Sequence, residues 1–299
     1  MHGILKMLTA GLRAGVVFVF VAVSLPATAL ADSAPALWKA TRGESTVYIF
    51  GTIHLLTEDV KWLSPRLRQH FDEADTLVLE INMDPAAQQA IGMLMFQIGF
   101  YRPPDNLQNH LSEEEYRKII DLVVDGQVPE AVVRQMRPWA AMITAVAKSA
   151  ATGNFNPELG ADRTFDRMAR ASGKTIEGLE TVEYQLRLFA DLPEDEQIYL
   201  LKESLKQIED IEEVFIRMRD AWLDGDVEEL ADIMNEGMDG NDDLMERFLI
   251  QRNRNWVAQV DAMLDSPGVT FMAVGAGHLA GDDNLIELLE DEGIDVERQ

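Results

Sequence analysis

Two histidines in this 299-residue chain stand in matching positions, each three residues after a glycine that ends an apolar segment. His54 follows Val-Tyr-Ile-Phe-Gly-Thr-Ile, and His278 follows Phe-Met-Ala-Val-Gly-Ala-Gly. Two carboxylates have a similar setting, since Glu80 follows Thr-Leu-Val-Leu and Glu180 ends a short segment at 174–180. The chain contains only five histidines, so the repeated Gly-x-x-His pattern indicates that the two histidines share a site.

Two imidazoles with one or two carboxylates are typical of a divalent metal site. Neutral imidazole nitrogen and carboxylate oxygen suit Zn, Mn, Fe or Co, and two histidines with one carboxylate leave a coordination position for water. A metal held in this way acidifies the water and polarises a carbonyl group. The glycines let the backbone turn sharply and approach a ligand closely. These residue types therefore predict a metal site that uses Glu80, Glu180 or both.

Each of these residues also has a structural explanation. A single Gly-x-x-His is more often a packed histidine than a ligand. Glu80 could form an ion pair with an arginine such as Arg252, because a buried carboxylate needs a partner. Glu180 could cap the helix that follows it. The repetition of the histidine pattern after two buried segments is what favours a functional site.

The apolar segments before these residues are predicted to be strands of one sheet. Leu37–Ala40 and Ser45–His54 indicate a hairpin, and further strands are expected at 76–81, 174–180, 269–275 and 294–296. Helical patterns fill about 85–172 and 193–264. The fold class is therefore α/β, with a mixed central sheet built from N- and C-terminal segments and a large helical insertion. In such sheets functional residues gather at the carboxyl ends of strands, where these four residues should meet.

The first 31 residues are typical of a secretory signal peptide. Lys6 and Arg13 precede an apolar stretch at 14–25, and Ala-Leu-Ala at 29–31 is a cleavage site. We expect one α/β domain over 32–299, a periplasmic or secreted location, and no stable membrane insertion after cleavage; a retained anchor is the alternative. There is no cysteine, so stability must come from the core.

The charge restricts the possible partners. Asp and Glu number 52 against 26 Lys and Arg, which gives a formal net charge of −26. Such a field repels nucleic acid, and no basic stripe interrupts it. We therefore expect no nucleic-acid partner, and a peptide or a small molecule as substrate.

Several motifs of the chain resemble the TraB/GumN family, which includes the Tiki proteases. They are Leu-Trp at 37–38, Tyr-Ile-Phe-Gly-Thr-Ile-His at 48–54, Leu-Val-Leu-Glu at 77–80, Arg-Pro-Trp at 137–139, Gly-Ala-Asp at 160–162, Gly-Leu-Glu-Thr at 178–181 with Gln185, Trp-x-x-Gly-Asp at 222–226, Arg-Asn-x-x-Trp at 252–256 and Val-Gly-Ala-Gly-His-Leu-x-Gly at 274–281. The resemblance covers nearly the whole chain after the signal peptide, in order. It implies an α/β fold related to erythromycin-esterase-like and ChaN-like proteins, with two Gly-x-x-His motifs and a glutamate as the functional positions. In the Tiki branch it implies metal-dependent cleavage of peptide bonds.

The sequence and the resemblance together predict an exported metal-dependent hydrolase of the TraB/GumN type. His54, Glu80 and His278 would bind the metal, expected to be Mn, Co or Zn. Glu180 or Asp162 would be the general base, and Arg163 or Arg252 would stabilise the developing oxyanion.

Three alternatives have different chemistry. A ChaN-like protein would bind haem or another small ligand through a histidine, and a metal-free esterase would use His54 or His278 as the general base. Gly-Ala-Gly-His-Leu-Ala at 275–280 also fits a dinucleotide fingerprint, but Asp282 and Asp283 would repel a pyrophosphate from the following helix. His110, in a polar loop, is expected to be a surface residue.

Overall fold

The computed structural model describes residues 34–152, 154–208, 210–237 and 241–299. The predicted signal peptide and its cleavage site lie outside the described residues. The segment Ser33–Gln299 forms one compact unit.

Six strands form one mixed sheet. They are β1 (Leu37–Arg42), β2 (Ser45–Thr52), β3 (Thr76–Leu79), β4 (Thr175–Gly178), β5 (Gly268–Gly275) and β6 (Val296–Arg298), in the spatial order β4-β3-β5-β2-β1-β6. The predicted hairpin is present, since β1 pairs antiparallel with β2 around a turn in which Gly43 has φ +59°. The four neighbours β4, β3, β5 and β2 are mutually parallel, and β6 pairs antiparallel with β1.

The two ends of the chain are joined at the centre of the sheet, because β5 lies between β3 and β2. The register places Phe50 beside Ala273 and Gly51 beside Val274. The predicted α/β fold, with a mixed sheet built from N- and C-terminal segments, is therefore confirmed.

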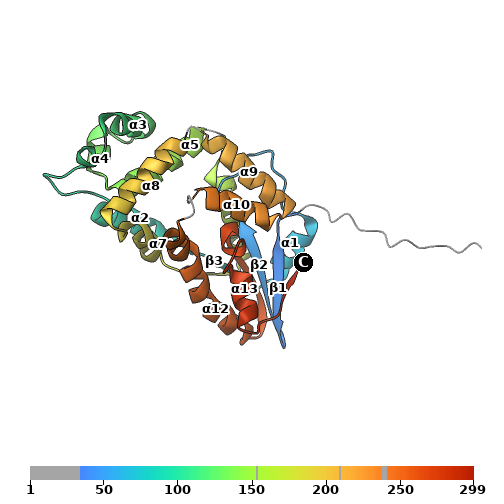
Figure 1. Ribbon diagram of the computed structural model, residues 1–299. Helices are drawn as coiled ribbons and strands as arrows, with labels where there is room; N and C mark the ends of the chain where they lie inside the picture. Colours follow the sequence, from blue (N-terminus) through green and yellow to red (C-terminus); the bar gives the residue numbers. More distant parts are fainter. Residues whose placement is uncertain (1–33, 153, 209, 238–240) are drawn as a thin grey trace, which may run out of the picture. The chain divides into compact units, whose positions relative to one another are not determined.

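Alternate residues of the strands pack on the two faces of the sheet, as period-two side-chain geometry requires. One face carries Phe50, Leu77 and Phe271 and is covered by α1 (Pro65–Glu73), α6 (Ala161–Ser172), α9 (Ile211–Asp224) and α10 (Val227–Gly237). The opposite face carries Ile49 and Met272 and is covered by α12 (Gln251–Leu264) and α13 (Leu285–Asp291). Figure 1 shows α12 and α13, in red-brown, beside the blue strands β1 and β2.

Most of the remaining helices form a cluster with an apolar core of its own, as the prediction of a large helical insertion implied. They are α2 (Pro85–Ile98), α3 (Glu113–Val123), α4 (Glu130–Gln135), α5 (Pro138–Thr152), α7 (Val182–Ala190) and α8 (Glu194–Gln207). Trp139, Leu201 and Ile119 are among the buried side chains of this core. None of the helices in the described residues has the length and apolar character needed to cross a membrane.

One helical segment changes its winding close to the sheet. The short helix α11 (Asp242–Met245) continues into a π-helical turn over Glu246–Ile250, from which α12 begins. A π-turn rotates the following residues relative to a regular α-helix, and such turns are frequent at functional sites. Here the turn ends two residues before Arg252.

Candidate active site

The four predicted residues follow the carboxyl ends of the four parallel strands. His54 lies two residues beyond β2, and Glu80 comes directly after β3. Glu180 lies two residues beyond β4, and His278 lies in η4 (Ala276–Leu279), a 3-10 turn that follows β5. Because these strands are parallel and adjacent, their carboxyl ends share one edge of the sheet. Parallel pairing thus brings four distant segments to one place.

Glu80 is held by three donors. The backbone N–H of Gly275 donates to Oε1 at 2.7 Å, while the guanidinium of Arg252 and the amide of Gln185 donate to Oε2 at 2.6 and 2.9 Å. A side chain at Gly275 would crowd this carboxylate, since a Cβ there would lie 3.0 Å from Oε1. Glu80 therefore forms the ion pair with Arg252 that the sequence offered as the structural explanation for its burial.

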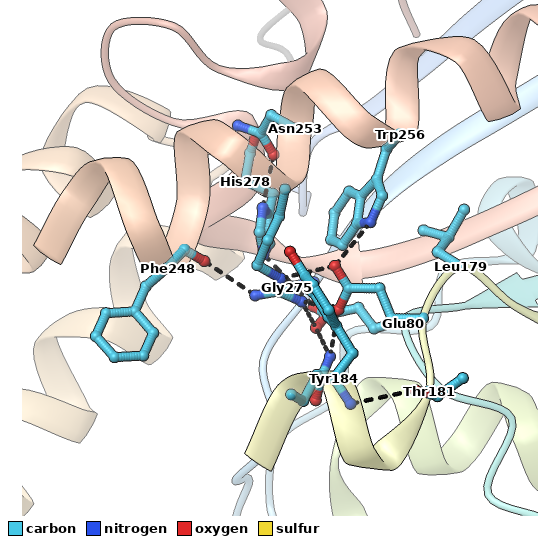
Figure 2. A network of polar contacts seen from close by, with 12 residues as sticks. Glu80, Leu179, Thr181, Tyr184, Phe248, Asn253, Trp256, Gly275 and His278 are labelled. Carbon is cyan, nitrogen blue, oxygen red and sulfur yellow. Dashed lines mark hydrogen bonds and ion pairs between the residues drawn. The ribbon is translucent and has the colours of Figure 1, made fainter. Parts of the chain in front are cut away.

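Glu180 shares the same guanidinium. Arg252 donates from Nε to Oε1 at 2.9 Å and from Nη2 to Oε2 at 2.8 Å. Trp256 Nε1 and Gln185 Nε2 complete the contacts of this carboxylate at 3.0 and 2.9 Å. Glu180 does not cap the next helix, because Thr181 is the N-cap of α7. Figure 2 shows Trp256 and Glu80 within this polar network.

Two carboxylates therefore share one arginine in a buried setting. The side chains of Arg252 and Glu180 are only 8% and 6% exposed. Burial would raise the pKa of Glu80, but the charges of His278 and Arg252 and the Gly275 hydrogen bond lower it to about 2. Because His278 is itself neutral above a pH of about 3, Arg252 and then His54 are the charges that keep Glu80 ionised at neutral pH.

His278 is fixed in one tautomer. Asn253 donates its amide N–H to the carbonyl groups of His278 and Asp283, so its Oδ1 faces the imidazole, 2.6 Å from Nδ1. The proton of the neutral ring must then reside on Nδ1, which leaves a lone pair on Nε2. That Nε2 lies 3.9 Å from Glu80 Oε1. The His278 ring is buried, and its centroid lies 4.2 Å from that of the Trp256 ring. This burial lowers the pKa of His278 to about 3.

His54 has the opposite character. Its Nδ1 lies 3.3 Å from Asp162 Oδ2, and 63% of the side chain is accessible to solvent. Desolvation in the cleft lowers the pKa of His54, but the hydrogen bonding and charge of Asp162 outweigh it and raise the pKa to about 9. The high solvent exposure screens part of this effect. His54 and His278 are therefore two histidines with opposite pKa shifts.

The backbone explains why Asp162 meets His54. Asp162 lies in the first turn of α6, whose N-cap is Gly160, and the N–H of Ala161 donates to the carbonyl of Ile53. Gly160 leaves no room for a side chain, because a Cβ there would lie 2.5 Å from the His54 carbonyl oxygen. Two buried oxygens near His54, Thr52 Oγ1 and Asp162 Oδ1, make no hydrogen bond with the described residues.

Two cavities of about 280 and 290 Å³ meet at Thr52, His54 and Glu80, which line both. We call the first the polar lobe; it is lined by charged and amide side chains, namely Asp162, Arg163, Asp166 and Gln185, together with Leu79, Ile81, Met83, Pro157 and Ala273. We call the second the apolar lobe. It is lined by Ile53, Leu55, Phe215, Met218, Leu230, Met234 and Leu249, together with Arg252 and residues 275–278.

The predicted site residues are thus arranged in three ways. His54, Glu80, Asp162 and Arg163 line the polar lobe, and His278 and Arg252 line the apolar lobe. Glu180 lines neither and lies behind Arg252, with hydrogen bonds to both of its oxygens. Of the two predicted general bases, the geometry favours Asp162. Of the two predicted oxyanion-stabilising arginines it favours Arg163, because Arg252 is already paired with two carboxylates.

Within the described residues, a group of side chains close enough to bind one metal ion lies outside the cleft. The group whose ligand atoms all lie within 4.8 Å of one another is Asp105, His110 and Glu194, rather than the predicted trio. His110 Nε2 lies 3.0 Å from Asp105, and its ring stacks on Tyr101 at 5.0 Å. His110 is therefore not a simple surface residue: its side chain is 19% exposed and joins the loop after α2 to the start of α8.

Residue patterns did not assign roles to the amides of Asn253 and Gln185. Asn253 orients His278, and Gln185 bridges Glu80 and Glu180. The only signal was their place in the family-like motifs, Asn253 directly after Arg252 and Gln185 after Gly-Leu-Glu-Thr.

Comparison with known proteins agrees with these motifs. The model of the TraB/PrgY/gumN family matches residues 36–298. A protein of Escherichia coli strain K12, named "Uncharacterized protein YbaP", is 23% identical over 255 residues, which cover 85% of this chain and 92% of YbaP. YbaP of Shigella flexneri has the same identity and coverage. No solved structure gives a significant match. Since the family model spans the sheet and both Gly-x-x-His segments, this chain belongs to the TraB/PrgY/gumN family.

Proposed function

We propose that the protein is an exported hydrolase that cleaves a peptide (amide) bond with water activated in the cleft between His54 and His278. The observation that carries the proposal is the pair of oriented imidazoles. Asp162 faces Nδ1 of His54, and Asn253 faces Nδ1 of His278. In both rings Nε2 is left for chemistry, as in sites where a second group orients a catalytic histidine.

The opposite pKa shifts suggest different roles for the two rings. His54, whose pKa is raised to about 9, carries a proton at neutral pH and can give it to a leaving group. His278, whose pKa is lowered to about 3, stays neutral at neutral pH and keeps a free lone pair on Nε2 that can accept a hydrogen bond from the attacking water and orient it. Arg163 lines the polar lobe beside the His54–Asp162 pair and is the cation available to an anionic group of the substrate.

In the metal-dependent form of the proposal, His54, Glu80 and His278 bind Mn, Co or Zn. The 3.9 Å between His278 Nε2 and Glu80 Oε1 suits two ligands of one ion, given metal–ligand bonds of about 2.0–2.2 Å. His54 does not fit as placed, because among the described residues the ligand atoms of His54, Glu80 and His278 do not all lie within 4.8 Å of one another. A bound metal would acidify water and polarise the carbonyl. The metal-free form needs only the side chains described.

The test is metal content and hydrolysis of a peptide library by wild type, His54→Ala and His110→Ala. The metal-dependent form expects one equivalent of metal in wild type and in His110→Ala, and its loss with activity in His54→Ala. If the metal is lost only in His110→Ala, it belongs to the Asp105–His110–Glu194 group. Activity that survives chelation selects the metal-free form. Full activity in His54→Ala refutes the hydrolase proposal in both forms.

Haem binding is the remaining candidate, and no observation favours it. His278 is only 3% exposed and packs against Trp256, so a haem iron has little access to its Nε2. A Soret band upon addition of haem, lost in a His54 variant, would reverse this ranking.

A further inference from the structure

The cleft differs in polarity on the two sides of His54 and Glu80. The apolar lobe is built by side chains of α9, α10 and the π-turn, among them Phe215, Met234 and Leu249. Met218 and Met234 are flexible side chains that can adapt to apolar groups of different shape. Each lobe is close to the lower limit of ligand cavities, roughly 300 Å³, so the cleft fits short extended segments rather than a folded partner.

The polar lobe contains one positive charge that the protein does not neutralise. Glu80 is paired with Arg252, Asp162 with His54, and Asp166 with Arg170 through contacts of 2.8 and 3.0 Å. The lobe's remaining charged side chain is Arg163, one turn before Arg167 on α6. Among the described residues Arg163 has no hydrogen bond, ion pair or ring partner. Arg167, by contrast, contacts Glu158.

A guanidinium without a partner in a cleft is unusual in a chain of net charge −26. A half-buried arginine without an anion forgoes the charge-assisted bonds that such groups normally make. Its place beside the His54–Asp162 pair means that an anion bound to it would lie next to the reacting bond.

We infer that the substrate carries a carboxylate on one side of the scissile bond, which binds Arg163, and an apolar group on the other side, which fills the apolar lobe. The inference rests on the proposed hydrolase function and specifies its substrate class: acidic–apolar peptide junctions. Net negative charge elsewhere on the protein repels such a substrate weakly, and Arg163 provides the local attraction that orients it.

The test uses quenched fluorescent peptides that differ at one position, with Glu, Gln or Lys on one side of a Phe or Leu, in both chain orientations. Wild type should prefer Glu over Lys by about tenfold in kcat/KM, which corresponds to about 1.4 kcal/mol. Arg163→Glu should reverse the preference, and Arg163→Gln should remove it. The ratio of kcat/KM for the Glu and Lys peptides is taken within each variant, so a general loss of activity in that variant cancels.

Arg66→Glu is the matched control, because it changes the net charge equally on α1, outside both lobes. Equal rates for Glu, Gln and Lys peptides in wild type would overturn the inference while leaving the hydrolase proposal intact. If no peptide is cleaved, the hydrolase proposal fails, and fluorescence anisotropy of the same labelled peptides still decides the inference. Tighter binding of the Glu peptide, reversed in Arg163→Glu, supports it, and equal binding refutes it.

Discussion

Replacing Arg252 with methionine should destabilise the protein strongly at neutral pH. The substitution keeps much of the apolar stem but leaves Glu80 and Glu180 facing each other with Gln185 as their shared donor. Both carboxylates are buried, with 16% and 6% of the side chain exposed. Breaking a buried ion pair by removing one partner typically costs about 3–5 kcal/mol, because the remaining charge is uncompensated.

The dependence on pH distinguishes this mechanism from simple loss of packing. In wild type the pKa of Glu80 is lowered to about 2 from 4.5, so its contribution of about 3 kcal/mol is present above pH 4.5 and is lost as the pH falls towards 2. In Arg252→Met, burial dominates and the pKa of Glu80 rises above 4.5. Stability then increases as the pH falls through that raised pKa. The difference between variant and wild type should therefore be smaller at pH 4.5 than at pH 7.5.

Urea unfolding followed by tryptophan fluorescence, at both pH values and in the presence of a chelator, measures this difference. Arg42→Met is the matched control, since Arg42 also bridges two carboxylates, Asp261 and Asp265, at 2.7 and 2.8 Å, but with a side chain that is 42% exposed. Exposed pairs contribute little, so the control should remain close to wild type. The reasoning would be refuted if both variants lost the same free energy of unfolding, or if the loss in Arg252→Met did not depend on pH.

Three further predictions concern the cleft. Asp162→Asn should lower the pKa of His54 from about 9 towards its ordinary value of 6.5, because the charge that raises it is removed; an NMR titration of the imidazole measures this. Asn253→Leu should release the Nδ1 proton of His278 from its acceptor and reduce activity about 10–100-fold, the usual effect of removing an orienting partner, with nitrogen-15 shifts reporting the tautomer. Gly160→Ala should displace His54 and Asp162, since the new Cβ would lie 2.5 Å from the His54 carbonyl oxygen and 2.7 Å from Asp162 Oδ1. The variant should remain folded but lose most of its activity.

Gly92→Ala is the control for the glycine substitution, because a Cβ at Gly92 meets nothing within 4 Å. Within α2 it should be neutral or stabilising by up to about 1 kcal/mol. An unchanged His54 titration in Asp162→Asn would show that the pair seen at 3.3 Å does not persist in solution.

The sequence predicted the arrangement of strands better than the arrangement of side chains. Period-two apolar runs and short connections identified the hairpin, and the rule for strand ends brought His54, Glu80, Glu180 and His278 to one edge. These features depend on backbone topology, which local patterns determine. The ion pair between Glu80 and Arg252 could be proposed as an alternative, because a buried carboxylate requires a partner.

Contacts that depend on rotamers and helix phase could not be predicted. The π-turn at Glu246–Ile250 alters the phase of α12, so a regular helix over this segment would not aim Arg252 and Asn253 at the same site. The pairing of His54 with Asp162 depends on where α6 begins relative to the end of β2. His110 ends a 3-10 turn and Glu194 begins α8, with α3 to α7 between them in the chain, so nothing local indicated their proximity.

The position of β5 also determines when the protein can fold. This strand is near the end of the chain, yet it fills the gap between β3 and β2. A nascent chain that stops before Gly268 would lack β5 and β6 and would leave edges of β3, β2 and β1 without partners, which favours aggregation or association with another chain. Pairing across such sequence distances makes folding slow. Synthesis of the last segment should therefore be the event that closes the sheet and assembles the cleft, and C-terminally shortened products should be inert.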